Sequence, residues 1–157
     1  MKTLVVYFSR NGHTPRLAKE IAKRCDGDLD VIHELHDEDS WTGKCRSAWQ
    51  ELTKAEAQIK MPARNPARYD LVIIGSPVWA TGIPPPVRTY VRQNAEHFKQ
   101  VAFFCAEGGS EDERAFAELT KLCGKRPLAT FAVEKKNLPA SAHLQGVSGF
   151  MDNIHLR

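Results

Sequence analysis

Five short apolar runs divide this chain at intervals that leave room for a helix between each pair. The runs are residues 4–8, 29–35, 71–74, 101–106 and 129–133. The first, third and fourth runs are continuous, which is typical of strands that helices cover on both faces. The second run alternates apolar and polar residues, which favours an edge strand. The runs therefore predict five strands.

The stretches between these runs repeat their apolar residues at helical spacing. They lie at residues 17–25, 41–59, 86–91, 116–123 and 141–156. Pro86 suits the first turn of a helix, and Gly124 suits a helix C-cap. Gly146 and Gly149 weaken the prediction for the last stretch, because glycine disfavours helix. Strands and helices that alternate in this order predict an α/β fold, a parallel sheet with helices on both faces.

Length and composition restrict the class of protein. With 157 residues, of which 42% are hydrophobic and 26% charged, residues 1–157 are expected to form a single globular domain. The chain has no run of about 20 apolar residues and no cleavable leader, which predicts a cytoplasmic protein without a membrane span. The net charge of +3 is too small to indicate nucleic acid as a partner.

The cysteines and histidines indicate no metal site. Cys25, Cys45, Cys105 and Cys123 lie far apart without zinc-binding spacing. We expect buried free thiols, as in a reducing cytosol. His33 and His36 are spaced too loosely to predict a metal centre.

The first loop of interest follows the first strand. In such folds ligands bind beyond the carboxyl ends of the strands, so the loops after the first, third and fourth strands are candidates. Residues 9–14 read SRNGHT and lead into a helix, whose free N–H groups and dipole attract phosphate. Because the chain lacks G-K-[ST] and G-x-G-x-x-G, the ligand that remains is a phosphomonoester held without a metal. A polar capping loop with no ligand has the same sequence features.

The other two loops contain an aromatic residue and a glycine pair. Residues 75–87 read GSPVWATGIPPPV and place Trp79 on an exposed turn between Pro77 and Gly82. A flat aromatic ligand explains such a residue, as does a partner protein or packing against the neighbouring loop. Residues 106–110 read AEGGS, and their amides can face a ligand or form a simple glycine turn.

Together the three loops resemble those of the flavodoxin family in order and spacing, over nearly the whole chain. Residues 9–14 match the phosphate loop, 76–82 the tryptophan-bearing flavin loop and 106–110 the second flavin loop. The resemblance implies a flavodoxin-like three-layer sandwich with a five-stranded, doubly wound parallel sheet in the order 2-1-3-4-5, and it implies bound FMN. The residues implied at the phosphate are Ser9, Arg10, Asn11, Gly12, His13 and Thr14. Those implied near the ring are Pro77, Val78, Trp79, Ala80, Thr81, Gly82, Glu107, Gly108 and Gly109.

The chain departs from the family pattern in the phosphate loop and in the second flavin loop. Asn11 stands where a threonine is usual, and His13 adds a group whose charged form a phosphate dianion favours. No aromatic residue lies between Cys105 and Arg114, where electron-carrier flavodoxins stack a tyrosine, and the chain is basic where the carriers are acidic. An open flavin face lets a nicotinamide or flat acceptor stack on it. Another aromatic, Trp41 or Trp49, can fill the gap instead.

Three functions follow from these observations. The first is an FMN-dependent oxidoreductase that moves electrons from a reduced nicotinamide to a quinone-like or other small acceptor. The second is a flavodoxin-type carrier that passes electrons between redox protein partners. The third is a flavin-free adaptor that uses the same loops to bind a partner. Missing signatures argue against other proteins of this topology: no acidic pair follows the first strand and no cysteine lies in the first loop.

Overall fold

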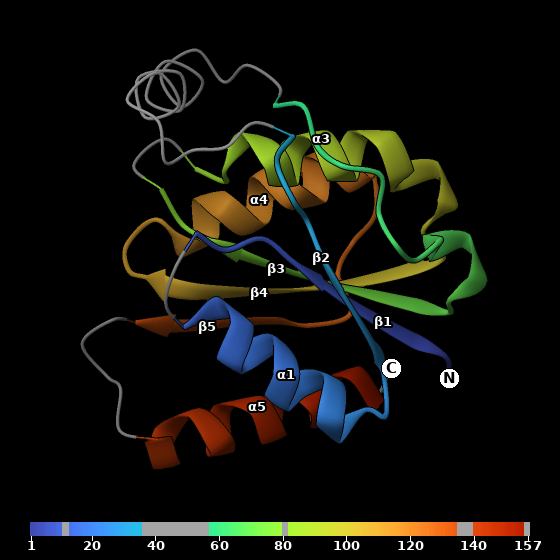
Figure 1. Cartoon of the computed structure of the whole chain (residues 1–157). Helices are drawn as coiled ribbons and strands as arrows, with labels where there is room; N and C mark the ends of the chain where they lie inside the picture. Colours follow the sequence, from blue (N-terminus) through green and yellow to red (C-terminus); the bar gives the residue numbers. More distant parts are fainter. Residues whose placement is uncertain (11–12, 36–56, 80–81, 135–139, 156–157) are drawn as a thin grey trace.

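One parallel sheet organises the molecule. The computed structural model describes residues 1–10, 13–35, 57–79, 82–134 and 140–155. Its five strands lie side by side in the order β2-β1-β3-β4-β5 (Figure 1). They are β1 (Thr3–Tyr7), β2 (Asp28–Val31), β3 (Leu71–Pro77), β4 (Gln100–Gly108) and β5 (Thr130–Glu134). The predicted α/β fold and the strand order implied by the resemblance are confirmed.

Helices cover both faces of this sheet. α1 (Thr14–Arg24) and α5 (Ala140–His155) lie on one face, and α3 (Pro85–Asn94) and α4 (Asp112–Cys123) lie on the other (Figure 1). Alternate residues of β1 enter opposite cores: Val5 packs with residues of α1 and α5, and Val6 packs with residues of α3 and α4. The run 4–8 is therefore continuous in its apolar residues because both faces of β1 are buried.

The helix ends follow the local signals in the sequence. Prolines occupy the first turns of α1 and α3, where a missing N–H costs nothing. Gly124 ends α4 with a left-handed backbone, φ 62°, as its predicted C-cap position requires. In α5, the ring of Phe131 fills the space that a Cβ on Gly146 would need. Close packing on β5 therefore accounts for a glycine that local propensity disfavours.

Two element predictions are wrong at their ends. β2 ends at Val31, whereas the predicted strand continued to residue 35. Beyond it the chain turns to an antiparallel partner: Lys60 N donates to His33 O over 2.7 Å, and Leu35 N donates to Gln58 O over 3.0 Å. Residues 57–60 are therefore extended, not the end of a helix, and the rest of the predicted 41–59 helix lies outside the described residues.

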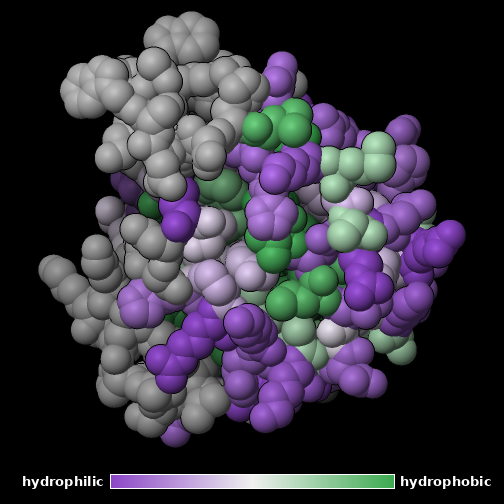
Figure 2. Space-filling view, viewed as in Figure 1, coloured by the Kyte–Doolittle hydropathy of each residue, from purple (hydrophilic) through white to green (hydrophobic). Residues whose placement is uncertain are grey.

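The surface is mixed in character. On the face shown in Figure 2, hydrophilic residues cover most of the described surface, with smaller hydrophobic areas between them. None of the helices described has the length and apolarity that a bilayer crossing requires. Cys25, Cys105 and Cys123 are free thiols, and burial raises the pKa of Cys123 to about 12 and that of Cys105 further. Cys45 lies outside the described residues.

Candidate functional site

The three candidate loops leave the sheet at one edge. β1, β3 and β4 are neighbours, with Tyr7 opposite Gly75 and Pro77 opposite Ala106. Phe8 N donates to Gly75 O over 3.2 Å, which extends the pairing of β1 and β3 into the first loop. Because all strands are parallel, their carboxyl ends meet at this edge, and the three loops begin at the same end of the sheet.

The first loop leads into the N-terminus of α1. His13 is the N-cap of α1 and its side chain makes no capping hydrogen bond, and no acidic residue lies in the first turn. In contrast, the first turn of α4 contains Asp112 and Glu113. Thr14 is the first residue of α1 and is 2% exposed. The positive end of the α1 dipole is therefore suited to an external anion such as a phosphate.

The second loop is anchored to the first through Trp79. Trp79 and Gly82 exchange two backbone hydrogen bonds of 2.8 and 2.9 Å, which close a tight hairpin. Phe8 meets the Trp79 ring edge-on, with centroids 6.4 Å apart, and the Arg10 guanidinium carbon lies 4.4 Å from the ring centroid. Trp79 is half-buried and packs against the neighbouring loop, and residues 80–81 of the expected exposed turn lie outside the described residues.

The third loop begins with an irregular strand end. Ala106 pairs with Val133 and Gly108 with Glu134, so Glu107 is an extra residue on β4. Such a bulge changes the direction of a strand end and interrupts its hydrogen bonds. A Cβ built on Gly109 meets no atom of the described residues within 4 Å. Within the described part of the chain, the space beside Gly109 at the end of β4 is therefore open.

The structure places most of the predicted site residues at this edge. Pro77 ends β3, and Val78 packs against the core under α3 and α4. Glu107 and Gly108 belong to the end of β4. The predicted residues outside the described ranges are Asn11, Gly12, Ala80 and Thr81. The described part of the chain contains no group of three His, Cys, Asp or Glu side chains placed for a metal; His36 lies outside it.

A buried ion pair beside the second loop was not expected from the sequence. Arg88 on α3 and Glu118 on α4 approach within 3.5 Å, and their side chains are 2% and 17% exposed. Arg88 also donates to Ile83 O over 2.7 Å. One signal was available: Arg88 is a lone charge in the otherwise uncharged first two turns of α3.

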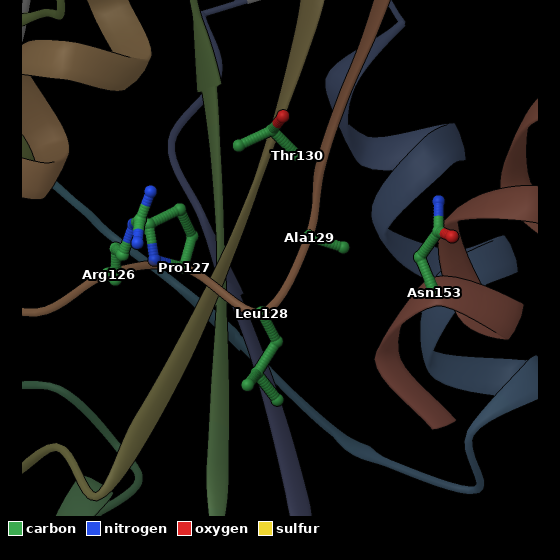
Figure 3. A pocket seen from close by; sticks show the side chains of 6 residues that line it. All are labelled: Arg126, Pro127, Leu128, Ala129, Thr130 and Asn153. Carbon is green, nitrogen blue, oxygen red and sulfur yellow. The ribbon is translucent and has the colours of Figure 1, made fainter. Parts of the chain in front are cut away.

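A cavity of about 460 Å³ lies at the other end of the sheet. Residues 126–130 line it where the chain enters β5, and Asn153 of α5 faces them (Figure 3). In a parallel α/β sheet the amino ends of the strands lie opposite the ligand-binding edge. This cavity is therefore separate from the three loops.

Comparison with known proteins gives one family. A family model described as flavodoxin matches residues 2–143. A protein from Bacteroides eggerthii described as a flavoprotein is 27% identical, with a TM-score of 0.77 and 99% of each chain covered. Another from Bacteroides uniformis is 26% identical, with a TM-score of 0.71 and 94% of this chain and 97% of that chain covered.

A third similar structure contains a ligand. It is a flavoprotein from Lactobacillus acidophilus in complex with FMN, 24% identical, with a TM-score of 0.67, and the match covers 83% of this chain and 92% of that chain. At this identity it shows a shared fold. No curated protein sequence matches the chain.

Proposed function

The chain belongs to the flavodoxin family, and from this membership we propose that it is an FMN-dependent oxidoreductase. Its electrons come from a reduced nicotinamide and go to a quinone-like or other small acceptor. FMN is the cofactor of the similar flavoprotein from Lactobacillus acidophilus. Bound FMN supplies hydride and electron transfer, and the protein supplies binding, orientation and electrostatics.

The observation that carries this proposal is the N-terminus of α1, where the side chain of the N-cap residue His13 makes no capping hydrogen bond and the first turn holds no acidic residue. Arg10 in the preceding loop adds a positive charge. Ser9, Thr14 and the first free N–H groups of α1 would hold the phosphate. These hydrogen-bond donors, together with the positive end of the α1 dipole, would stabilise the charge of the phosphate without the magnesium ion that nucleotide sites commonly use.

The ring would lie between the second and third loops. Trp79 presents an aromatic surface held by the hairpin to Gly82, and the end of β4 adds backbone groups at Gly108 and Gly109. Aromatic contact contributes about 0.5–1.5 kcal/mol beyond the area buried. The open space beside Gly109 leaves room for a planar donor or acceptor.

A comparison of FMN with riboflavin tests the phosphate site. Each charge-assisted hydrogen bond contributes about 1.5–3 kcal/mol, so two of them favour FMN by at least about 100-fold. Thr14→Ala should weaken FMN binding about tenfold and leave riboflavin unchanged, because riboflavin lacks the phosphate. Thr130→Ala, at the opposite end of the sheet, is the control and should change neither affinity. Equal affinities of the unmodified protein for both flavins in a fluorescence titration would refute the proposal.

A further inference from the structure

Ile83, which follows the hairpin between Trp79 and Gly82, forms hydrogen bonds with side chains of two helices. Ile83 O accepts a hydrogen bond of 2.7 Å from Arg88 Nη1 of α3. Ile83 N donates to Glu118 Oε2 of α4 over 3.3 Å. The main chain of Ile83 is thus held on both sides by side chains of opposite charge. We call Ile83, Arg88 and Glu118 the Ile83 clamp.

The same two charges also bind each other. Arg88 Nη1 lies 3.5 Å from Glu118 Oε1, so the two helices and the loop form one connected group. Arg88 is 2% exposed. A buried charge costs free energy unless it is paired, and an apolar pair of similar size is often at least as stable. Stability alone is therefore a weak reason for an ion pair at this position.

Glu118 also contacts the last residue of the hairpin. A Cβ built on Gly82 would overlap the Glu118 carboxylate, and Gly82 has φ +120°, a conformation that favours glycine. The carboxylate therefore fits against the hairpin only because residue 82 has no side chain. Since Gly82 is bonded to Trp79 by both backbone hydrogen bonds, a continuous chain of contacts leads from Glu118 to the tryptophan.

We infer that Arg88 and Glu118 are positioning residues that hold Trp79 in place for the flavin ring. This inference rests on the proposed function for its ligand. Neither residue needs to touch the flavin, since each acts through Ile83 and the hairpin. The phosphate site at α1 lies on another loop and does not depend on the Ile83 clamp.

The two flavins make this role measurable. FMN and riboflavin share the ring and differ in the phosphate, so loss of the clamp lowers both affinities by the same factor. Glu118→Leu removes the ion pair and the acceptor for Ile83 N, and it should weaken the binding of both flavins about tenfold. Glu118→Gln keeps an acceptor oxygen at similar volume and should restore both affinities to within about threefold.

A ligand-free measurement separates this inference from the proposed function. With Trp41→Phe and Trp49→Phe as the background, Trp79 is the only one of the three tryptophans left. Acrylamide should quench Trp79 more strongly in Glu118→Leu than in Glu118→Gln. Glu20→Leu removes the carboxylate of the Glu20–Arg24 pair on α1 and is the control, with no change expected.

The results of these measurements decide separately on the proposed function and on the positioning role of the Ile83 clamp. A Glu118→Leu protein with a lower Tm but unchanged Trp79 quenching and flavin affinities would overturn the positioning role. If the unmodified protein binds neither flavin, the proposed function and the flavin part of this inference fail, and quenching alone decides whether the clamp holds Trp79. If Glu118→Leu does not fold, the double variant Arg88→Met/Glu118→Leu takes its place, because it leaves no unpaired buried charge. Quenching and flavin affinities of this double variant equal to those of the unmodified protein would overturn the inference.

Discussion

Gly109 lies in the third loop, where the resemblance to the flavodoxin family implies that an electron carrier would have a stacked tyrosine. A Cβ there meets no atom of residues 1–10, 13–35, 57–79, 82–134 and 140–155 within 4 Å, and Gly109 is not among the residues with positive φ. Its carbonyl accepts from Asp112 N over 3.3 Å, a bond that any side chain at 109 leaves intact. We therefore expect Gly109→Tyr to fold, with a change of about 0.5 kcal/mol or less in the free energy of unfolding.

The effect on function should be large and in opposite directions for binding and turnover. A tyrosine against the ring adds about 0.5–1.5 kcal/mol of aromatic contact, which corresponds to FMN binding that is roughly 2- to 13-fold tighter. The same ring occupies the space where a nicotinamide or quinone stacks. Since misplacement of reactants by about 1 Å can cost about 100-fold, kcat/KM for nicotinamide oxidation should fall between roughly 10- and 100-fold.

Steady-state oxidation of a nicotinamide with a quinone acceptor, on FMN-loaded protein, measures this effect. Gly109→Ala is the matched control, because its Cβ fits the open space and should leave turnover within about twofold. A Gly109→Tyr protein with parental kcat/KM would refute the argument that this face admits the substrate. Unmodified holoprotein that oxidises no nicotinamide, yet accepts electrons from a reductase protein, would make it a carrier.

Two further predictions concern stability. Gly75→Ala places a Cβ against the buried ring of Phe104 and should lower the free energy of unfolding by about 1–3 kcal/mol in urea titrations. This penalty should vanish in a Phe104→Leu background, and an equal penalty in both backgrounds would contradict the overlap. Tyr90 OH is buried and has no hydrogen-bond partner within the described part of the chain. Tyr90→Phe should therefore raise the free energy of unfolding by about 1 kcal/mol and the Tm by about 2–4 °C. A lower Tm would show that the hydroxyl group has a hydrogen-bond partner.

Local patterns in the sequence predicted most of the elements. Continuous apolar runs marked β1, β3 and β4, because a strand buried on both faces shows this in its own residues. The polar break at residues 9–13 before α1 located the candidate phosphate loop. Turn and cap chemistry likewise acts within a few residues, which is why the prolines that begin α3 and Gly124 at the end of α4 were predicted correctly.

The errors arose where a partner distant in sequence decides the local structure. Periodicity extended β2 to residue 35, but residues 33–35 bond instead to residues 58–60. Ile59 suits a helical repeat, yet pairing with Glu34 makes its segment extended. Backbone groups at a sheet edge take whichever partner the tertiary structure brings near, and tertiary context overrides weak propensity.

The sequence by itself determined the order of strands and helices along the chain, the parallel sheet and the loops that meet at its carboxyl edge. These follow from the spacing of apolar residues and from the rules for connections between parallel strands. Only the tertiary structure decided the contacts within that edge. Arg10 lies over Trp79, and Ile83 lies between Arg88 and Glu118, although Glu118 is 35 residues further along the chain than Ile83. No local pattern encodes such a pair, because the distance between its members depends on how α3 and α4 pack on the finished sheet.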